Sequence, residues 1–105
     1  MTILDVDKLY VKNMFVGTIE RKGIEVYRKD SLALSVSSAT FQIFKRDGTE
    51  VTTPAPATIE TVDADTVKVS ADIHANEAGD FYVEFTYVVG SWTKKARAYY
   101  RVYEL

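Results

Sequence analysis

The chain has 105 residues, of which 47% are hydrophobic and 27% charged, as expected for one globular domain spanning residues 1–105. Its formal net charge of −2 argues against a nucleic-acid partner, because nucleic-acid-binding domains usually carry a strong basic excess. The absence of cysteine excludes a disulfide framework and thiolate metal sites. No apolar run approaches the roughly 20 residues of a membrane-spanning helix, and no secretory signal is recognised, so we expect no membrane partner.

The first thirty residues carry the weakest pattern. Residues 9–16 are predicted to form a strand, although their apolar side chains do not alternate cleanly. Lys22-Gly23 is predicted to be a turn that precedes a short strand over residues 24–27. Residues 1–20 form either a strand of the domain or an arm that reaches a neighbouring molecule, and the pattern leaves both interpretations open.

Several segments in the middle of the chain alternate between apolar and polar residues, as strands with one buried face require. They are residues 31–36, 39–45 and 66–73, and residues 58–62 are predicted to be a further short strand. Ser37-Ser38 is predicted to separate the first two of these segments. Asp47-Gly48 is a strong turn signal, after which residues 49–52 are predicted to begin a return strand. Pro54 and Pro56 lack backbone donors, so their segment is predicted to be a loop or a sheet edge.

The last part of the chain is predicted to be one long hairpin. Residues 81–89 and 92–103 alternate with period two, and Gly90-Ser91 between them fits a two-residue loop of type II′. Such a loop pairs Val89 with Trp92, which fixes the register of the whole hairpin.

In this register the two faces of the hairpin differ in character. One face is polar, and on it the register places Glu84 opposite Arg97 and Tyr82 opposite Tyr99. Cross-strand charge and aromatic pairs of this kind are favourable. The opposite face is apolar and is predicted to face the core. It consists of Phe81, Val83, Phe85, Tyr87, Ala96, Ala98 and Tyr100.

These segments amount to seven or eight short strands, with turn signals every eight to twelve residues and no convincing long helix. The spacing is typical of an all-β sandwich or barrel. We favour an immunoglobulin-like β-sandwich of antiparallel strands, because most strands have one apolar and one polar face.

Residues 77–83, EAGDFYV, resemble the corner that precedes the penultimate strand of immunoglobulin domains. Phe81 stands where that corner has a tyrosine, and a phenylalanine cannot make the corner's hydrogen bond. Residues 29–102 are similar to small immunoglobulin-like domains of tailed-phage structural proteins, such as the N-terminal domains of baseplate upper proteins. The shared pattern is an acidic residue before an apolar strand, an Asp-Gly turn, and a Gly-x-aromatic hairpin that closes on the C-terminal strand.

The resemblance implies a non-enzymatic structural protein of a phage or prophage particle, in its head–tail region, tail or baseplate. Its partners would be further copies of itself, in a homo-oligomer, or other phage structural proteins. It would be found in the virion, or in the host bacterial cytoplasm during assembly. The alternative function is a carbohydrate-binding or adhesion module of a bacterial surface protein.

Candidate groups for catalysis or metal binding are sparse. His74 is the single histidine, and no serine or cysteine motif accompanies it; residues 74–78 are predicted to form one helical turn. Asp5 and Asp7, and Asp63 and Asp65, form two D-x-D pairs, but a calcium ion needs six to eight converging oxygen atoms. Turn chemistry explains the second pair better. We therefore predict no catalytic residue, no metal site and no cofactor.

The strongest candidate surface is the polar face of the hairpin, since Tyr and Arg are enriched at protein–protein hot spots. Its residues are Tyr82, Arg97, Tyr99, Arg101 and Tyr103, with Trp92 at the hairpin tip. With Lys94 and Lys95 the last strand is basic, a pattern found in single-strand nucleic-acid binders, but Glu84 and the acidic overall charge favour a solvated face. An ordinary outer face remains the alternative, because strands favour tyrosine. Trp92 either caps the core or is an exposed anchor.

Overall fold

The computed structural model of the chain describes residues 3–4, 13–28 and 34–104. Among these residues there are nine strands and no helix that is long or apolar enough to cross a membrane. The strands are β1 (Ile3–Leu4), β2 (Met14–Phe15), β3 (Ile19–Arg28), β4 (Val36–Lys45), β5 (Ala55–Pro56), β6 (Thr58–Asp63), β7 (Thr66–His74), β8 (Gly79–Val89) and β9 (Trp92–Tyr103).

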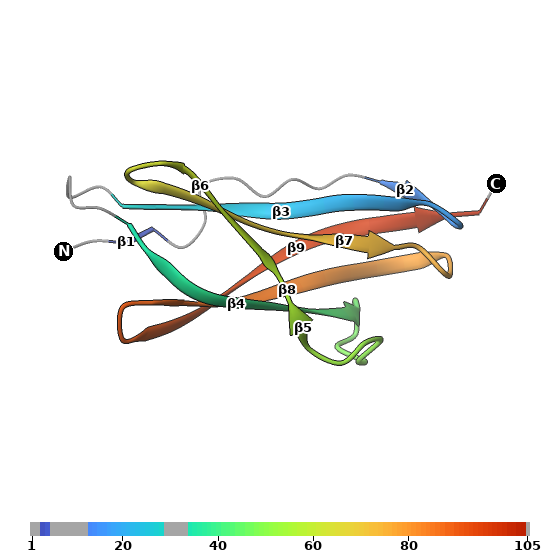
Figure 1. Cartoon of the computed structure of the whole chain (residues 1–105). Helices are drawn as coiled ribbons and strands as arrows, with labels where there is room; N and C mark the ends of the chain where they lie inside the picture. Colours follow the sequence, from blue (N-terminus) through green and yellow to red (C-terminus); the bar gives the residue numbers. More distant parts are fainter. Residues whose placement is uncertain (1–2, 5–12, 29–33, 105) are drawn as a thin grey trace.

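The strands form two sheets that pack face to face (Figure 1). Sheet I has the order β1-β3-β7-β6, and sheet II has the order β2-β9-β8-β4-β5. The predicted fold class is confirmed, because the chain is an all-β, immunoglobulin-like sandwich. The nine strands exceed the seven or eight predicted, because they include three strands of only two residues each, β1, β2 and β5. The β2–β9 pair is parallel, whereas all strands were predicted to be antiparallel.

The C-terminal hairpin has the predicted register over its whole length. Val89 pairs with Trp92, and the pairing continues without a shift to Gly79 and Val102. Gly90 has a φ of 61°, a left-handed conformation that a glycine adopts without the steric strain of other residues. The sequence pattern of two strands and their loop was therefore sufficient to position residues 81–89 of β8 against β9, and the pairing extends two residues further than predicted.

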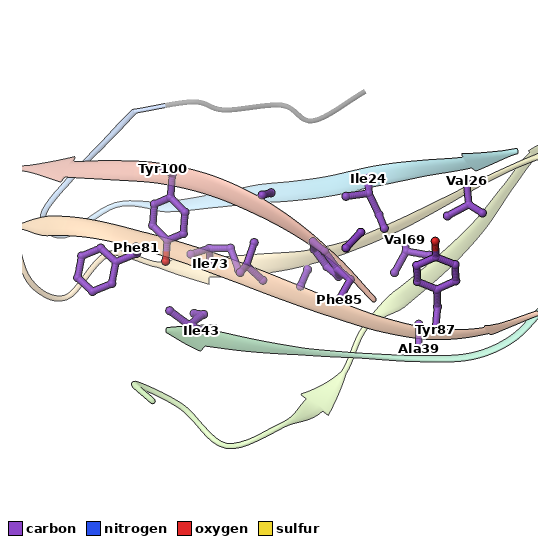
Figure 2. Close-up of a cluster of buried hydrophobic side chains, with 14 of the residues drawn as sticks. Ile24, Val26, Ala39, Ile43, Val69, Ile73, Phe81, Phe85, Tyr87 and Tyr100 are labelled. Atoms are coloured by element: carbon purple, nitrogen blue, oxygen red, sulfur yellow. The ribbon is translucent and has the colours of Figure 1, made fainter. Parts of the chain in front are cut away.

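The core lies between the inner faces of the two sheets (Figure 2). All seven residues of the apolar hairpin face are buried there, as predicted. Sheet I contributes Ile24 and Val26 from β3 and Val69 and Ile73 from β7. Complete burial of a side chain of this size stabilises the fold by about 1.5–3 kcal/mol, so these contacts hold the two sheets together.

The predicted turn at Lys22-Gly23 is wrong, because β3 runs straight through both residues. Gly23 pairs with Ser70 in the neighbouring strand β7. A Cβ atom at this glycine would lie 2.7 Å from the carbonyl oxygen of Val69 and 2.9 Å from Cβ of Ser70. Gly23 therefore allows two strands to approach each other closely. The sequence alone does not distinguish such a glycine from a glycine in a turn.

Three further local predictions are also wrong. Residues 49–52 form no strand, and only Glu50 makes an isolated bridge to Phe44 after the Asp47-Gly48 turn. His74 ends β7, and no helical turn follows it over residues 75–78. Ser37-Ser38 does not separate two strands, because β4 runs through both serines with a bulge between Val36 and Ser38. Elsewhere the predictions fared better. Pro56 lies in the edge strand β5 of sheet II, and Pro54 lies in the loop before it, as predicted. Residues 9–12 and 31–33 lie outside the described part of the chain.

Candidate functional site

The outer face of sheet II contains a row of three aromatic side chains. The register aligns Phe44 of β4, Tyr82 of β8 and Tyr99 of β9 across the sheet. The rings of Phe44 and Tyr82 stack with their centroids 5.0 Å apart, and those of Tyr82 and Tyr99 lie 5.4 Å apart at a tilt of 55°. Tyr82 was predicted to be exposed, but only 5% of it is accessible, because its neighbours on both sides cover it.

Two guanidinium groups lie over this aromatic row. The Arg97 guanidinium is 4.5 Å from the ring centroid of Tyr82, and the Arg46 guanidinium is 4.9 Å from that of Tyr99. A planar cation above an aromatic face is attracted by the ring quadrupole. Arg46 was missed in the sequence, because its proximity to Tyr99 depends on β4 and β9 flanking β8.

Carboxylates on β8 hold the cations of β9 in place. Glu84 accepts a hydrogen bond from Arg97 Nε at 3.0 Å and pairs with Lys95 Nζ at 3.4 Å. Asp80 accepts a hydrogen bond of 2.6 Å from Arg101 Nε, and this bond lowers the pKa of the Asp80 carboxyl below its ordinary value. The predicted pairing of Glu84 with Arg97 is therefore present as a direct ion pair.

Aromatic surface remains accessible at one end of this face. Tyr103 is 40% exposed, and Phe15 of β2, 44% exposed, has its ring centroid 6.1 Å from that of Tyr103. Arg101 lies between Tyr99 and Tyr103 along β9 and is also exposed. We call four alternate residues on the outer face of β9, toward its C-terminal end, the docking row. They are Arg97, Tyr99, Arg101 and Tyr103.

Trp92 does not belong to this surface. Its alternation along β9 is that of Ala96 and Ala98, which face the core, but it lies at the hairpin tip and is 50% exposed. Lys94 Nζ lies 5.8 Å from its ring centroid. Trp92 is thus an exposed side chain at the far end of β9 from Tyr103, and it does not cap the core.

The other sequence candidates do not converge on a catalytic or metal site. Within the described residues, no group of three His, Cys, Asp or Glu side chains is placed to hold a metal ion. Asp63 Oδ1 accepts a hydrogen bond from the amide of Asp65 at 3.1 Å, as the turn interpretation predicted. Asp5 and Asp7 lie outside the described residues. His74 is exposed at the end of β7.

Comparison with known proteins relates this chain to others by fold alone. No protein-family model matches the sequence, and no curated protein matches it. A family 123 glycoside hydrolase from Clostridium perfringens, described in relation to glycolipid glycan hydrolysis, superimposes with a TM-score of 0.56 at 8% identity over 96% of this chain. A DUF4785 family protein from Legionella pneumophila superimposes with a TM-score of 0.52 at 10% identity over 93%. The chain spans 26% and 28% of the length of these two proteins.

Proposed function

We propose that this protein is a non-enzymatic structural component of a phage or prophage particle that docks other copies of itself, or neighbouring particle proteins, through the outer face of sheet II. The observation that carries the docking role is the docking row with Phe15, where half-exposed aromatic rings alternate with exposed arginines. Tyrosine and arginine supply much of the binding energy at protein interfaces. The assignment to a phage particle rests on the sequence resemblance over residues 29–102.

The contacts within this face favour docking because they preorganise it. Glu84 fixes the position of Arg97, and Asp80 fixes that of Arg101. Long side chains that are already held in one geometry lose less conformational entropy when a partner binds. The four side chains alternate along one strand that is paired to β8, so the strand geometry sets the spacing of these aromatic and cationic groups.

The test is the solution mass measured by light scattering across a concentration series. We expect the unmodified chain to form a discrete oligomer, and a Tyr99→Glu, Tyr103→Glu variant to dissociate while its β-sheet circular dichroism remains intact. The matched control is Thr58→Glu, Val62→Glu, which adds the same charges at exposed positions of β6 in sheet I. A chain that stays monomeric throughout, or a control that dissociates equally, would contradict docking of copies through sheet II.

A carbohydrate-binding module is the second candidate, and the exposed Trp92 at the hairpin tip is the observation that favours it. Aromatic rings of this kind present a flat apolar face to which a sugar ring can bind. Trp92 is the single tryptophan of the chain, so its fluorescence reports directly on that site. If docking is the function, adding mono- and oligosaccharides leaves this fluorescence unchanged. A saturable change that is lost in Trp92→Ala would favour the glycan function instead.

A further inference from the structure

The sandwich is open between its two sheets beside the end of β7. The β6–β7 pairing stops at Ser70, so the last four residues of β7 have no β6 neighbour on that side. The opening arises because the chain crosses from β5 in sheet II to β6 in sheet I, as Figure 1 shows. Pro56, the last residue of β5 before this crossing, lacks the amide donor that would extend a strand beside β7.

A cavity of about 610 Å³ occupies this opening, a volume within the range of small-molecule sites. Its inner walls are mainly apolar. They include Phe41 and Ile43 of β4, Phe81 of β8, and Tyr100 and Val102 of β9. Phe81 and Tyr100 stack with their centroids 5.7 Å apart and form an aromatic wall. The cavity is therefore suited to an apolar ring or chain.

One polar group is directed into this apolar space. Tyr100 is only 5% exposed, and Figure 2 shows its hydroxyl end pointing from β9 toward Ile43 and Phe81. In the described part of the chain this hydroxyl makes no hydrogen bond. Burial raises the pKa of Tyr100 to about 12, so the hydroxyl is protonated at neutral pH and can donate. A buried hydroxyl without a hydrogen-bond partner is unfavourable, and most buried hydroxyls in proteins have such a partner.

The charges at the mouth of the cavity are already neutralised. Asp72 pairs with Arg21 at 3.2 Å, and Glu77 pairs with Lys45 at 3.4 Å. The ammonium of Lys22 lies 5.2 Å from the centroid of the Tyr100 ring, but Lys22 does not line the cavity. Because the two carboxylates that line the cavity are already paired, neither is free to select a cationic ligand, and the cavity favours a neutral one.

We propose that this cavity binds a small neutral molecule with an apolar ring or chain and one carbonyl or ether oxygen, which accepts a hydrogen bond from the Tyr100 hydroxyl. The site lies between the sheets and is separate from the docking row on the outer face. If no ligand binds in the cavity, the docking proposal is therefore unaffected. Equally, self-association of the chain would not show that the cavity binds a ligand.

The experiment compares two probes of nearly the same shape by NMR titration of the full chain. 2-Acetylnaphthalene offers a carbonyl acceptor, and 2-isopropylnaphthalene does not. We expect saturable shifts of the methyl signals of Ile43, Val51 and Val102, with the ketone binding roughly 3- to 10-fold more tightly, the contribution of one neutral hydrogen bond. The Tyr100→Phe variant keeps the aromatic wall but lacks the hydroxyl, so its affinity for the ketone should fall to its affinity for the hydrocarbon.

A second variant tests the location. Ala55→Trp places a large side chain at the cavity wall from the edge strand β5, and both probes should lose affinity while the remaining methyl spectrum shows a folded sandwich. Absence of saturable shifts with the ketone would overturn the proposal. So would equal ketone affinity in Tyr100→Phe and the unmodified chain, or binding that persists in folded Ala55→Trp.

Discussion

The two faces of the β8–β9 hairpin satisfy their side chains in different ways. On the inner face, Phe85 and Tyr87 are completely buried against sheet I. On the outer face, Glu84 and Arg97 remain partly in solvent and bind each other. Both faces come from the same two strands, because successive residues point to opposite sides. The inner face therefore determines whether the hairpin folds, whereas the outer face determines what the folded hairpin can contact.

The largest expected effect comes from the inner face. Phe85→Ala removes a fully buried aromatic ring and leaves a cavity between the sheets, so we expect the free energy of unfolding to fall by about 3–5 kcal/mol. Phe15→Ala, on the exposed end of the outer face, should change it by no more than about 0.5 kcal/mol. Urea unfolding followed by circular dichroism measures both. Equal losses in the two variants would remove the distinction between the faces.

A smaller loss is expected in sheet I, where Gly23 permits close approach of β3 and β7. Gly23→Ala places a Cβ atom 2.7 Å from a backbone oxygen, so one strand must shift, at a cost of about 1–3 kcal/mol. Thr61→Ala, at an exposed position of β6, is the control and should be within about 0.5 kcal/mol of the unmodified chain. Thermal and urea unfolding distinguish them, and an unchanged stability in Gly23→Ala would show that the strands have room to separate.

The ion pairs of the outer face contribute less. Glu84→Gln removes the carboxylate that serves both Arg97 and Lys95, and we expect a loss of about 1 kcal/mol that shrinks at high salt. Lys95→Gln removes only an exposed partner and should be close to neutral. Unfolding at low and high ionic strength measures both. A salt-independent loss in Glu84→Gln would indicate lost packing instead of lost charge attraction.

The smallest effect is a pH dependence from Asp80. Its pKa is lowered in the folded chain by the hydrogen bond from Arg101, so the stabilisation is present above the unfolded pKa of an aspartate and is lost as the pH falls through the folded value. Stability should therefore decline on the acid side of about pH 4. Asp80→Asn should decline less steeply over that range. Identical pH profiles for the two proteins would show that the Asp80–Arg101 pair has no influence on folding.

The sequence predicted those features that depend on neighbours along one strand or across one loop. The register that joins Val89 to Trp92 follows from alternation and a glycine in the loop, and the ion pair of Glu84 with Arg97 follows from the register. The burial of Tyr82 was not predictable in this way. It depends on Phe44 lying on the other side of β8, and that pairing joins strands far apart in the chain.

The cavity was missed for the same reason. Its walls come from both sheets, and its opening depends on where β6 stops pairing with β7. Gly23 illustrates a different limit, because a glycine that allows two strands to approach has the same sequence signature as a glycine in a turn. Contacts between sheets and close backbone approaches therefore had to come from the three-dimensional structure.

Hydroxyl-radical footprinting across the concentration range of self-association tests the docking claim most directly, since it reports the solvent exposure of individual side chains. We predict that Phe15, Tyr99 and Tyr103 lose reactivity together as the oligomer forms, while Trp92 at the other end of β9 keeps the reactivity it has in dilute solution. Protection of Trp92 with no change at Tyr99 and Tyr103 would contradict docking through the outer face of sheet II.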